Sequence, residues 1–236
     1  MSTVAWITAR GLLGRRRFLL LFPLPILLVG LAALSRGFGV TSSEWGPAVI
    51  YGLGFAVVLP VVALIVGTGV LGAEIDDGTI VHILSKPLPR WRIILPKLLV
   101  AAAVTAVTVA VPLYIVGVLA EGVRLGLALV ASSAIGALAY SAIFVALSLM
   151  TRRPVLVGLV YVLIWEGLLG NIVSGTKSLS VQQYVVTITD WIAGTPLLDA
   201  SVGRVTSVVM SVLVTVGFTW LAIERMRSFS VAGETG

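Results

Sequence analysis

Long apolar runs separated by short polar segments dominate the chain. Six of these runs have close to the ~20 residues that an α-helix needs to cross a ~30 Å hydrocarbon core. A backbone inside lipid has to satisfy its hydrogen bonds internally, and the runs lack the strict alternation of membrane β-strands, so we expect helices. The pattern predicts an all-α integral membrane protein, a single transmembrane domain over residues 1–236. The expected spans are residues 18–34, 48–71, 98–120, 125–150, 155–173 and 205–223.

An amphipathic segment precedes the first apolar run. Within residues 1–17, Trp6, Ile7 and Leu12 recur at roughly helical spacing, and Arg10 is one of the basic residues around them. This pattern is typical of a helix in the membrane interface, although a plain basic tail would carry the same arginines. The arginines before the apolar run also resemble a twin-arginine export signal. With the apolar run that follows, they could form a secretory signal, but we favour a membrane span for residues 18–34, because such a signal needs a soluble protein behind it and further apolar runs follow here.

A second amphipathic segment precedes the last span, within residues 174–204. Its apolar and polar positions predict a half-buried helix at the outer membrane interface. Tyr184 and Trp191 are the expected interfacial anchors, because aromatic residues concentrate at the level of the lipid head groups.

The composition agrees with this class of protein. Charged residues make up 11% of the chain and hydrophobic residues 58%. A soluble domain carries about 25% charged residues, so this chain has too few to cover a water-facing surface. The chain contains no cysteine, which excludes disulfides, thiolate metal sites and cysteine nucleophiles.

The distribution of basic residues predicts the orientation. They lie between the apolar runs, which argues against a nucleic-acid partner despite a net charge of +6. Cytoplasmic loops of membrane proteins carry the excess of lysine and arginine, so the richer set should be cytoplasmic, with both termini. The expected location is the plasma membrane. The richer set is Arg10, Arg15, Arg16, Arg17, Lys86, Arg90, Arg92, Lys97, Arg152, Arg153, Arg225 and Arg227, and the other set is Arg36, Arg124, Lys177 and Arg204.

The connection between the second and third spans, residues 72–92, predicts a docking element. Negative charge comes before a short apolar stretch, where a helix dipole favours it, and Pro87 ends that stretch. A short, partly apolar helix in a cytoplasmic loop has little to pack against within so small a chain. We therefore expect it to dock into another protein, although an ordinary solvated loop is the simpler alternative. The candidate docking residues are Glu74, Asp77, Gly78, Thr79, Ile80, Val81, His82, Ile83 and Leu84.

This connection resembles the coupling helix of the ABC-2-type permeases of ABC transporters. The resemblance rests on Glu74, Gly78-Thr79, Leu84-Ser85, Pro87 and Arg90, in that order. The amphipathic N-terminal "elbow" helix, the six spans and the external helical segment also match, so the likeness covers essentially the whole chain. The family usually has a small polar residue after the proline, whereas this chain has a leucine.

The resemblance implies a mechanism. Two permease chains, either two copies or two homologues, form a pathway lined by their second and fifth spans. Each coupling helix fits a groove of a separate ATP-binding subunit, whose movement on binding ATP passes to the spans. The chain itself has no Gly-x-x-x-x-Gly-Lys-Ser/Thr string, the cradle for phosphate. We therefore expect no cofactor in this chain, no enzymatic activity of its own, and ATP and Mg²⁺ in the partner subunit.

Glu166 is the acidic residue that lies deep in an expected span. It falls about 16 Å along the helix from Val155 at 1.5 Å per residue, and a charge at such depth is a candidate functional site. The alternative is a protonated or hydrogen-bonded carboxyl group that packs against a neighbouring span. We expect Ser132, Gly136 and Tyr140 to pack helices together, and contact with a substrate is the alternative. The candidate pathway residues are Glu166, Gly67, Thr68 and Asn171.

Other functions have weaker support. A secondary transporter or channel driven by an ion gradient would carry charges in several spans and paired discontinuous helices. An intramembrane enzyme would need a constellation of catalytic groups, and His82 has no cysteine or second histidine with which to bind a metal. A purely structural membrane subunit is the third alternative. Association with an ATPase separates the exporter from all three.

Overall fold

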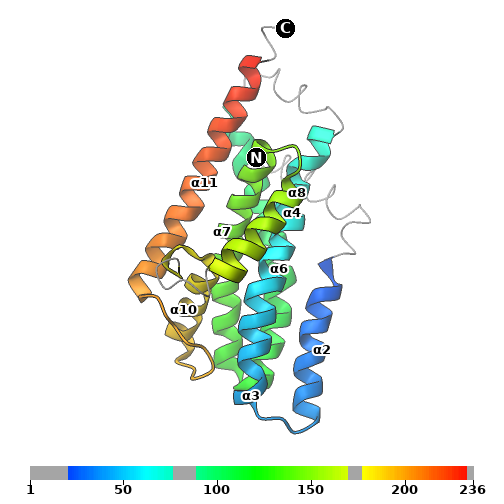
Figure 1. Cartoon of the computed structure of the whole chain (residues 1–236), viewed down its shortest axis with the longest axis vertical. Helices are drawn as coiled ribbons and strands as arrows, with labels where there is room; N and C mark the ends of the chain where they lie inside the picture. The colour runs from blue at the N-terminus through cyan, green and yellow to red at the C-terminus, as the bar shows by residue number, and fades with distance from the viewer. Residues whose placement is uncertain (1–20, 77–88, 170–176, 233–236) are drawn as a thin grey trace.

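The computed structural model describes residues 21–76, 89–169 and 177–232 (Figure 1). All the regular structure in these ranges is helical. The side chains of residues 72–76, 168–169 and 227–232 lie outside the description. The helices are α2 Pro23–Gly37, α3 Ser42–Pro47, η2 Ala48–Val58, α4 Leu59–Asp76, α6 Trp91–Ala120, α7 Val123–Met150, α8 Pro154–Val160, η3 Tyr161–Leu169, η4 Lys177–Leu179, α10 Val181–Ala193 and α11 Arg204–Ala232.

Four helices in the described ranges are long and apolar enough to cross a membrane. They coincide with the expected second, third, fourth and sixth spans. Two shorter apolar helices, Pro23–Gly37 and Pro154–Gly167, lie on the expected first and fifth spans, each beside residues outside the description. Six crossings therefore remain a prediction at those two positions. The four long helices are Ser42–Leu71, Trp91–Ala120, Val123–Met150 and Arg204–Met226.

Helix α2 begins at Pro23 and α6 at Trp91, whereas the expected spans begin at residues 18 and 98, and residues 18–20 lie outside the description. Pro23 and Pro25, which we placed inside the first span, lie in the first turn of α2. Proline lacks the N–H that an interior turn needs, so it is tolerated at a helix start. The third span begins seven residues earlier than expected, at Trp91, so Arg92 and Lys97 belong to a helix and not to the loop before it.

Helices α6 and α7 form a close antiparallel hairpin. Gly122 makes the turn with a φ of 109°, a backbone conformation that glycine adopts without a steric penalty. A Cβ atom on Gly117 would lie 2.7 Å from the Cα atom of Gly126. The two glycines therefore allow backbone contact between the helices, as small residues do in membrane bundles.

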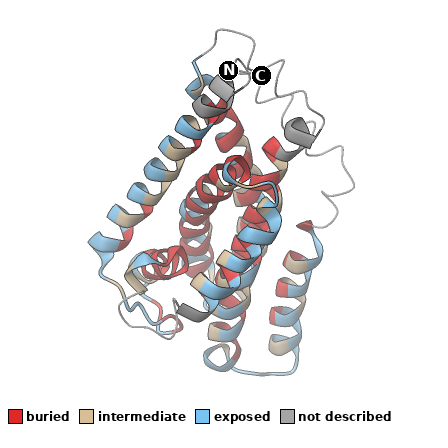
Figure 2. Cartoon of the chain, turned by 45° about the horizontal axis from the view of Figure 1, so that its top comes forward, coloured by how far each residue is buried: buried red, intermediate tan, exposed pale blue. Residues whose placement is uncertain are grey.

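Helix α7 lies at the centre of the bundle and packs against α4, α6, α10 and α11. Figure 2 shows it buried along most of its length, with exposed residues on the outer faces of the surrounding helices. Ser132 and Tyr140 are fully buried. A Cβ atom on Gly136 would lie 2.6 Å from Val185 of α10 and 2.8 Å from Leu59 of α4. The polar and small residues of this span thus pack helices together, as expected.

The outside of the bundle is apolar. Helix α11 exposes 77% of Val205 and 65% of Trp220. A groove of about 640 Å³ between α2 and α6 is lined by apolar residues and Thr108. Continuous exposed apolar surface of this kind is unusual for a soluble monomer and fits contact with lipid. Figure 1 shows α4 and α11 ending at one end of the bundle, and the α2–α3 turn and α10 in the opposite half.

Candidate functional site

The structure reaches only the edge of the expected docking element. Glu74 lies near the C-terminal end of α4, which extends to Asp76. Residues 77–84, which hold the other candidate docking residues, lie outside the described residues, as does Asn171. The docking assignment remains a prediction from the sequence.

Gly67 and Thr68 face the interior of the bundle. A Cβ atom on Gly67 would lie 2.9 Å from the Cβ atom of Phe144 in α7. The Thr68 side chain is 5% exposed, and its hydroxyl donates to the Leu64 carbonyl at 2.7 Å. Close packing against α7 accounts for the glycine, and a contribution of either residue to a pathway stays a prediction.

The carboxylate of Glu166 is the centre of a buried polar cluster. Its side chain is 1% exposed. One oxygen, Oε1, accepts the Tyr161 hydroxyl and the Val181 N–H, each at 3.1 Å. The other, Oε2, accepts the Ser180 hydroxyl at 2.5 Å and the Gln182 N–H at 3.4 Å. Four donors on two oxygens are the pattern of a carboxylate that acts only as an acceptor.

Glu166 meets the N-terminus of α10. Ser180 is the N-cap residue in an extended conformation, and its side chain accepts the Gln183 N–H at 3.4 Å. The first N–H groups of a helix lack partners within the helix and carry the positive end of its dipole. A negative charge among these groups is stabilised even inside an apolar bundle. The geometry agrees with a hydrogen-bonded carboxyl group, but its partners are Ser180, the first residues of α10, and Tyr161 of its own helix.

Helix α10 is more deeply buried than we expected. Tyr184 was expected as an interfacial anchor, but it is fully buried, and its hydroxyl donates to the Ser178 carbonyl at 2.5 Å. Burial, reinforced by the charge of Glu166, raises the pKa of Tyr184 to about 12, so the hydroxyl remains a donor at neutral pH. Trp191 is 53% exposed. The prediction that Tyr184 lies at the membrane interface was therefore wrong, because α10 packs between α7 and α11.

Further hydrogen bonds tie α10 to the bundle. The Gln183 side-chain amide donates to the Tyr51 hydroxyl at 3.0 Å, and its oxygen accepts the Ser201 hydroxyl at 3.0 Å. The Thr189 hydroxyl donates to the Ser132 hydroxyl at 2.6 Å. We call Glu166 and the side chains that bond to it or to Gln183 the α10 network: Tyr51, Tyr161, Glu166, Ser180, Gln183 and Ser201.

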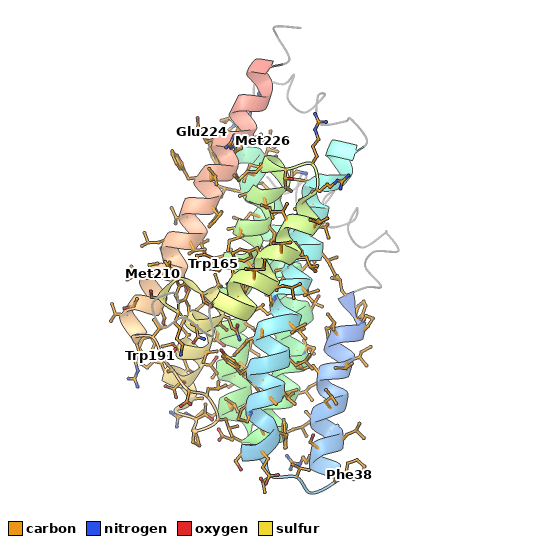
Figure 3. The ribbon with its side chains drawn as sticks, in the orientation of Figure 1. Phe38, Trp165, Trp191, Met210, Glu224 and Met226 are labelled. Atoms are coloured by element: carbon orange, nitrogen blue, oxygen red, sulfur yellow. The ribbon has the colours of Figure 1, made fainter. Side chains whose placement is uncertain are left out.

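Two segments of wide π-helical winding supply half of the network. Tyr51 lies in η2, and Tyr161 and Glu166 lie in η3. The two segments contact each other and belong to the expected second and fifth spans. Figure 3 places Trp165, the neighbour of Glu166, at mid-height of the bundle. π-Helical turns are rare and occur frequently at functional positions, which makes this junction the candidate functional site.

Some buried polar side chains of the described residues lack hydrogen-bond partners. The side-chain amide of Gln182 and the Ser141 hydroxyl are buried, and neither has a hydrogen-bond partner within the described ranges. Such groups are costly unless they meet a polar ligand or water. The described residues hold no group of three or more histidines and carboxylates that would bind a metal ion. The arrangement at Glu166 can therefore fix a helix and accept hydrogen bonds.

The sequence was compared with known proteins. It matches the protein family described as "ABC-2 family transporter protein" over residues 2–223. A comparison with curated proteins gives no match.

Proposed function

Because the family match spans nearly the whole sequence, the chain belongs to the ABC-2 transporter family, and we propose that it is the permease subunit of an ATP-driven exporter. The full-length match is the observation that carries this proposal. The helical bundle and its four long apolar helices agree with a membrane transport component.

The proposed coupling to ATP rests on the segment between α4 and α6. This segment carries the candidate docking residues, from Glu74 to Leu84. Helix α4 ends at Asp76 and α6 begins at Trp91, so only a short stretch joins two long apolar helices. Its docking into a separate ATP-binding subunit, which binds ATP and Mg²⁺, would move both helices from one end. We place this end, and both termini, in the cytoplasm of a cell whose plasma membrane holds the protein.

A second permease chain, either another copy or a homologue, completes the proposed pathway. Helix α8 and segment η3 have an apolar face that is exposed among the described residues. Leu156 of α8 is 55% exposed, and Leu163 and Ile164 of η3 are 62% and 51% exposed. This face belongs to the fifth expected span, one of the two spans that line the pathway in the proposed dimer.

We propose that Glu166 affects transport through α10 and not by direct contact with the substrate. Its oxygens already accept four donors, and its side chain is almost fully buried. An ion-driven transporter would use such a charge as an exchangeable site, and the occupied geometry gives that alternative no support.

The test is the ATPase activity of purified components. We expect no hydrolysis by the permease alone, and hydrolysis that the permease changes when an ATP-binding subunit from the same operon is added. A matched control is an ATP-binding subunit that lacks the lysine of its phosphate-binding loop, which should copurify with the permease but stay inactive. Robust hydrolysis by the rigorously purified permease, or failure of every such subunit to bind it, would contradict the proposal.

A further inference from the structure

Lys97 places a positive charge inside the bundle. It is the seventh residue of α6, and its side chain is 1% exposed. Its Nζ atom donates to the carbonyl oxygen of Val70 in α4 at 3.0 Å. Lysine is almost never fully buried unless it is paired, because removing an ammonium group from water is costly. An apolar side chain of similar length would avoid this cost. The lysine at this position should therefore have a role that depends on its charge.

The hydrogen bond joins the two helices on either side of the candidate docking element. Val70 lies six residues before the end of α4 at Asp76, and Lys97 lies six residues after the start of α6 at Trp91. A carbonyl oxygen has two lone pairs. The Val70 carbonyl can therefore accept the Lys97 ammonium and still take part in the hydrogen bonding of its own helix. The bond fixes the height of one helix relative to the other.

We propose that Lys97 is a positioning residue that holds the ends of α4 and α6 together as one unit. Apolar contacts between helices in a membrane are not directional, whereas a charged hydrogen bond specifies one register. A movement delivered at residues 77–90 would then reach both helices at once. This inference rests on the proposed function, because it needs an ATP-binding subunit that delivers the movement.

The first test compares variants in complex with the ATP-binding subunit. Lys97→Met keeps the length of the side chain and removes the donor, and Lys97→Arg retains a donor. Arg92→Met is the matched control, because Arg92 is an exposed basic residue of α6 stacked on Trp91, with its guanidinium 5.3 Å from the ring centre. We expect Lys97→Met to copurify with the subunit but to lose about fivefold or more of the permease's effect on ATP hydrolysis, the lower end of typical coupling between sites.

A merely structural role would lower thermal stability and the yield of the complex together. The positioning role predicts that the complex forms, that Lys97→Arg restores most of the coupling, and that Arg92→Met behaves like the parent. Parent-like coupling in Lys97→Met would overturn the inference. Absence of any complex in the parent would instead contradict the proposed function, so the two failures are distinct.

The second test uses the parent sequence at Lys97, so it can be carried out even if the Lys97→Met variant does not accumulate in the membrane. The chain has no cysteine, so spin labels at Ile65→Cys in α4 and Leu99→Cys in α6 report the distance between these helices without background labelling. In the parent complex we expect this distance to be the same with and without ATP. An ATP-dependent change larger than about 1.5 Å, the rise of one helical residue, would show that the helices move separately and would overturn the inference.

Discussion

The carboxylate of Glu166 accepts the backbone N–H of Val181 at 3.1 Å and so joins η3 to the first turn of α10. The same carboxylate accepts the hydroxyl of the N-cap residue, Ser180. The depth of Glu166 in an expected span indicated a site on a transport path. In this arrangement its carboxylate anchors helix α10. Its removal should loosen α10 before it changes any contact with a substrate.

Glu166→Ala should destabilise the protein more than Glu166→Gln. The alanine variant leaves the Ser180 hydroxyl and two backbone N–H groups buried without their acceptor, and each such group costs about 1–3 kcal/mol. Glutamine keeps one acceptor oxygen for the Val181 N–H. Thermal unfolding in lipid nanodiscs should therefore rank the parent above Glu166→Gln, and Glu166→Gln above Glu166→Ala.

The control for this series is Glu121→Ala, which removes an exposed carboxylate just after α6. It should unfold at the temperature of the parent. If Glu166→Ala matches this control, Glu166 does not anchor α10. Glu166→Gln should still assemble with the ATP-binding subunit and change the stimulated ATPase activity, and a variant indistinguishable from the parent would mean that Glu166 has no part in transport.

Gly117→Ala should destabilise the hairpin of α6 and α7. The added methyl group would lie 2.7 Å from backbone atoms of Gly126, which cannot rotate away as a side chain can. Overpacking of this kind costs roughly 1–3 kcal/mol. Gly217→Ala in α11 is the matched control, because a Cβ atom there would meet nothing within 4 Å. A lower unfolding temperature only for Gly117→Ala supports the packing, and equal behaviour of the two variants contradicts it.

Reporter fusions should place both termini and the α7–α8 turn in the cytoplasm. The physical reason is the excess of basic residues on that side of the membrane. Fusions after Arg153 and Arg227 should report cytoplasm, and a fusion after Gly122 should report the outside. An external signal from the fusion after Arg227 would contradict the six-span topology.

The long spans were predictable because length and hydrophobicity alone identify a helix that can cross a membrane. The packing role of Gly136 was also predictable, since small residues at helical spacing mark contacts between helices. The start of α2 at Pro23 was not predictable, because hydrophobicity runs through Pro23 and Pro25 without showing which of them begins the helix.

The position of α10 was not predictable, because apolar residues look the same whether they face lipid or protein. A half-buried helix was expected in this segment, yet even its polar residues Gln182 and Gln183 are buried. Gln183 bonds to Tyr51, 132 positions away in the chain. Pairings of this range depend on the arrangement of the helices and leave no local pattern. The burial of Lys97 was missed for the same reason, since its acceptor is a backbone carbonyl on another helix.

The most direct test of the account is whether Ile83→Asp separates the permease from its ATP-binding subunit. Burial of such a side chain in a groove contributes ~1.5–3 kcal/mol, and aspartate would add an unpaired charge to that groove. Insertion into the membrane should survive, because residue 83 lies outside the expected spans. Lys177→Ala, on the opposite side of the membrane in the proposed topology, is the control and should leave the complex intact.

The measurement is copurification of the ATP-binding subunit, together with its permease-dependent ATPase activity. The account predicts a normally inserted Ile83→Asp permease that no longer retains the subunit or no longer stimulates it, while Lys177→Ala behaves like the parent. Intact copurification and coupled ATPase activity in a normally inserted Ile83→Asp permease would contradict the docking assignment, and with it the proposed coupling to ATP.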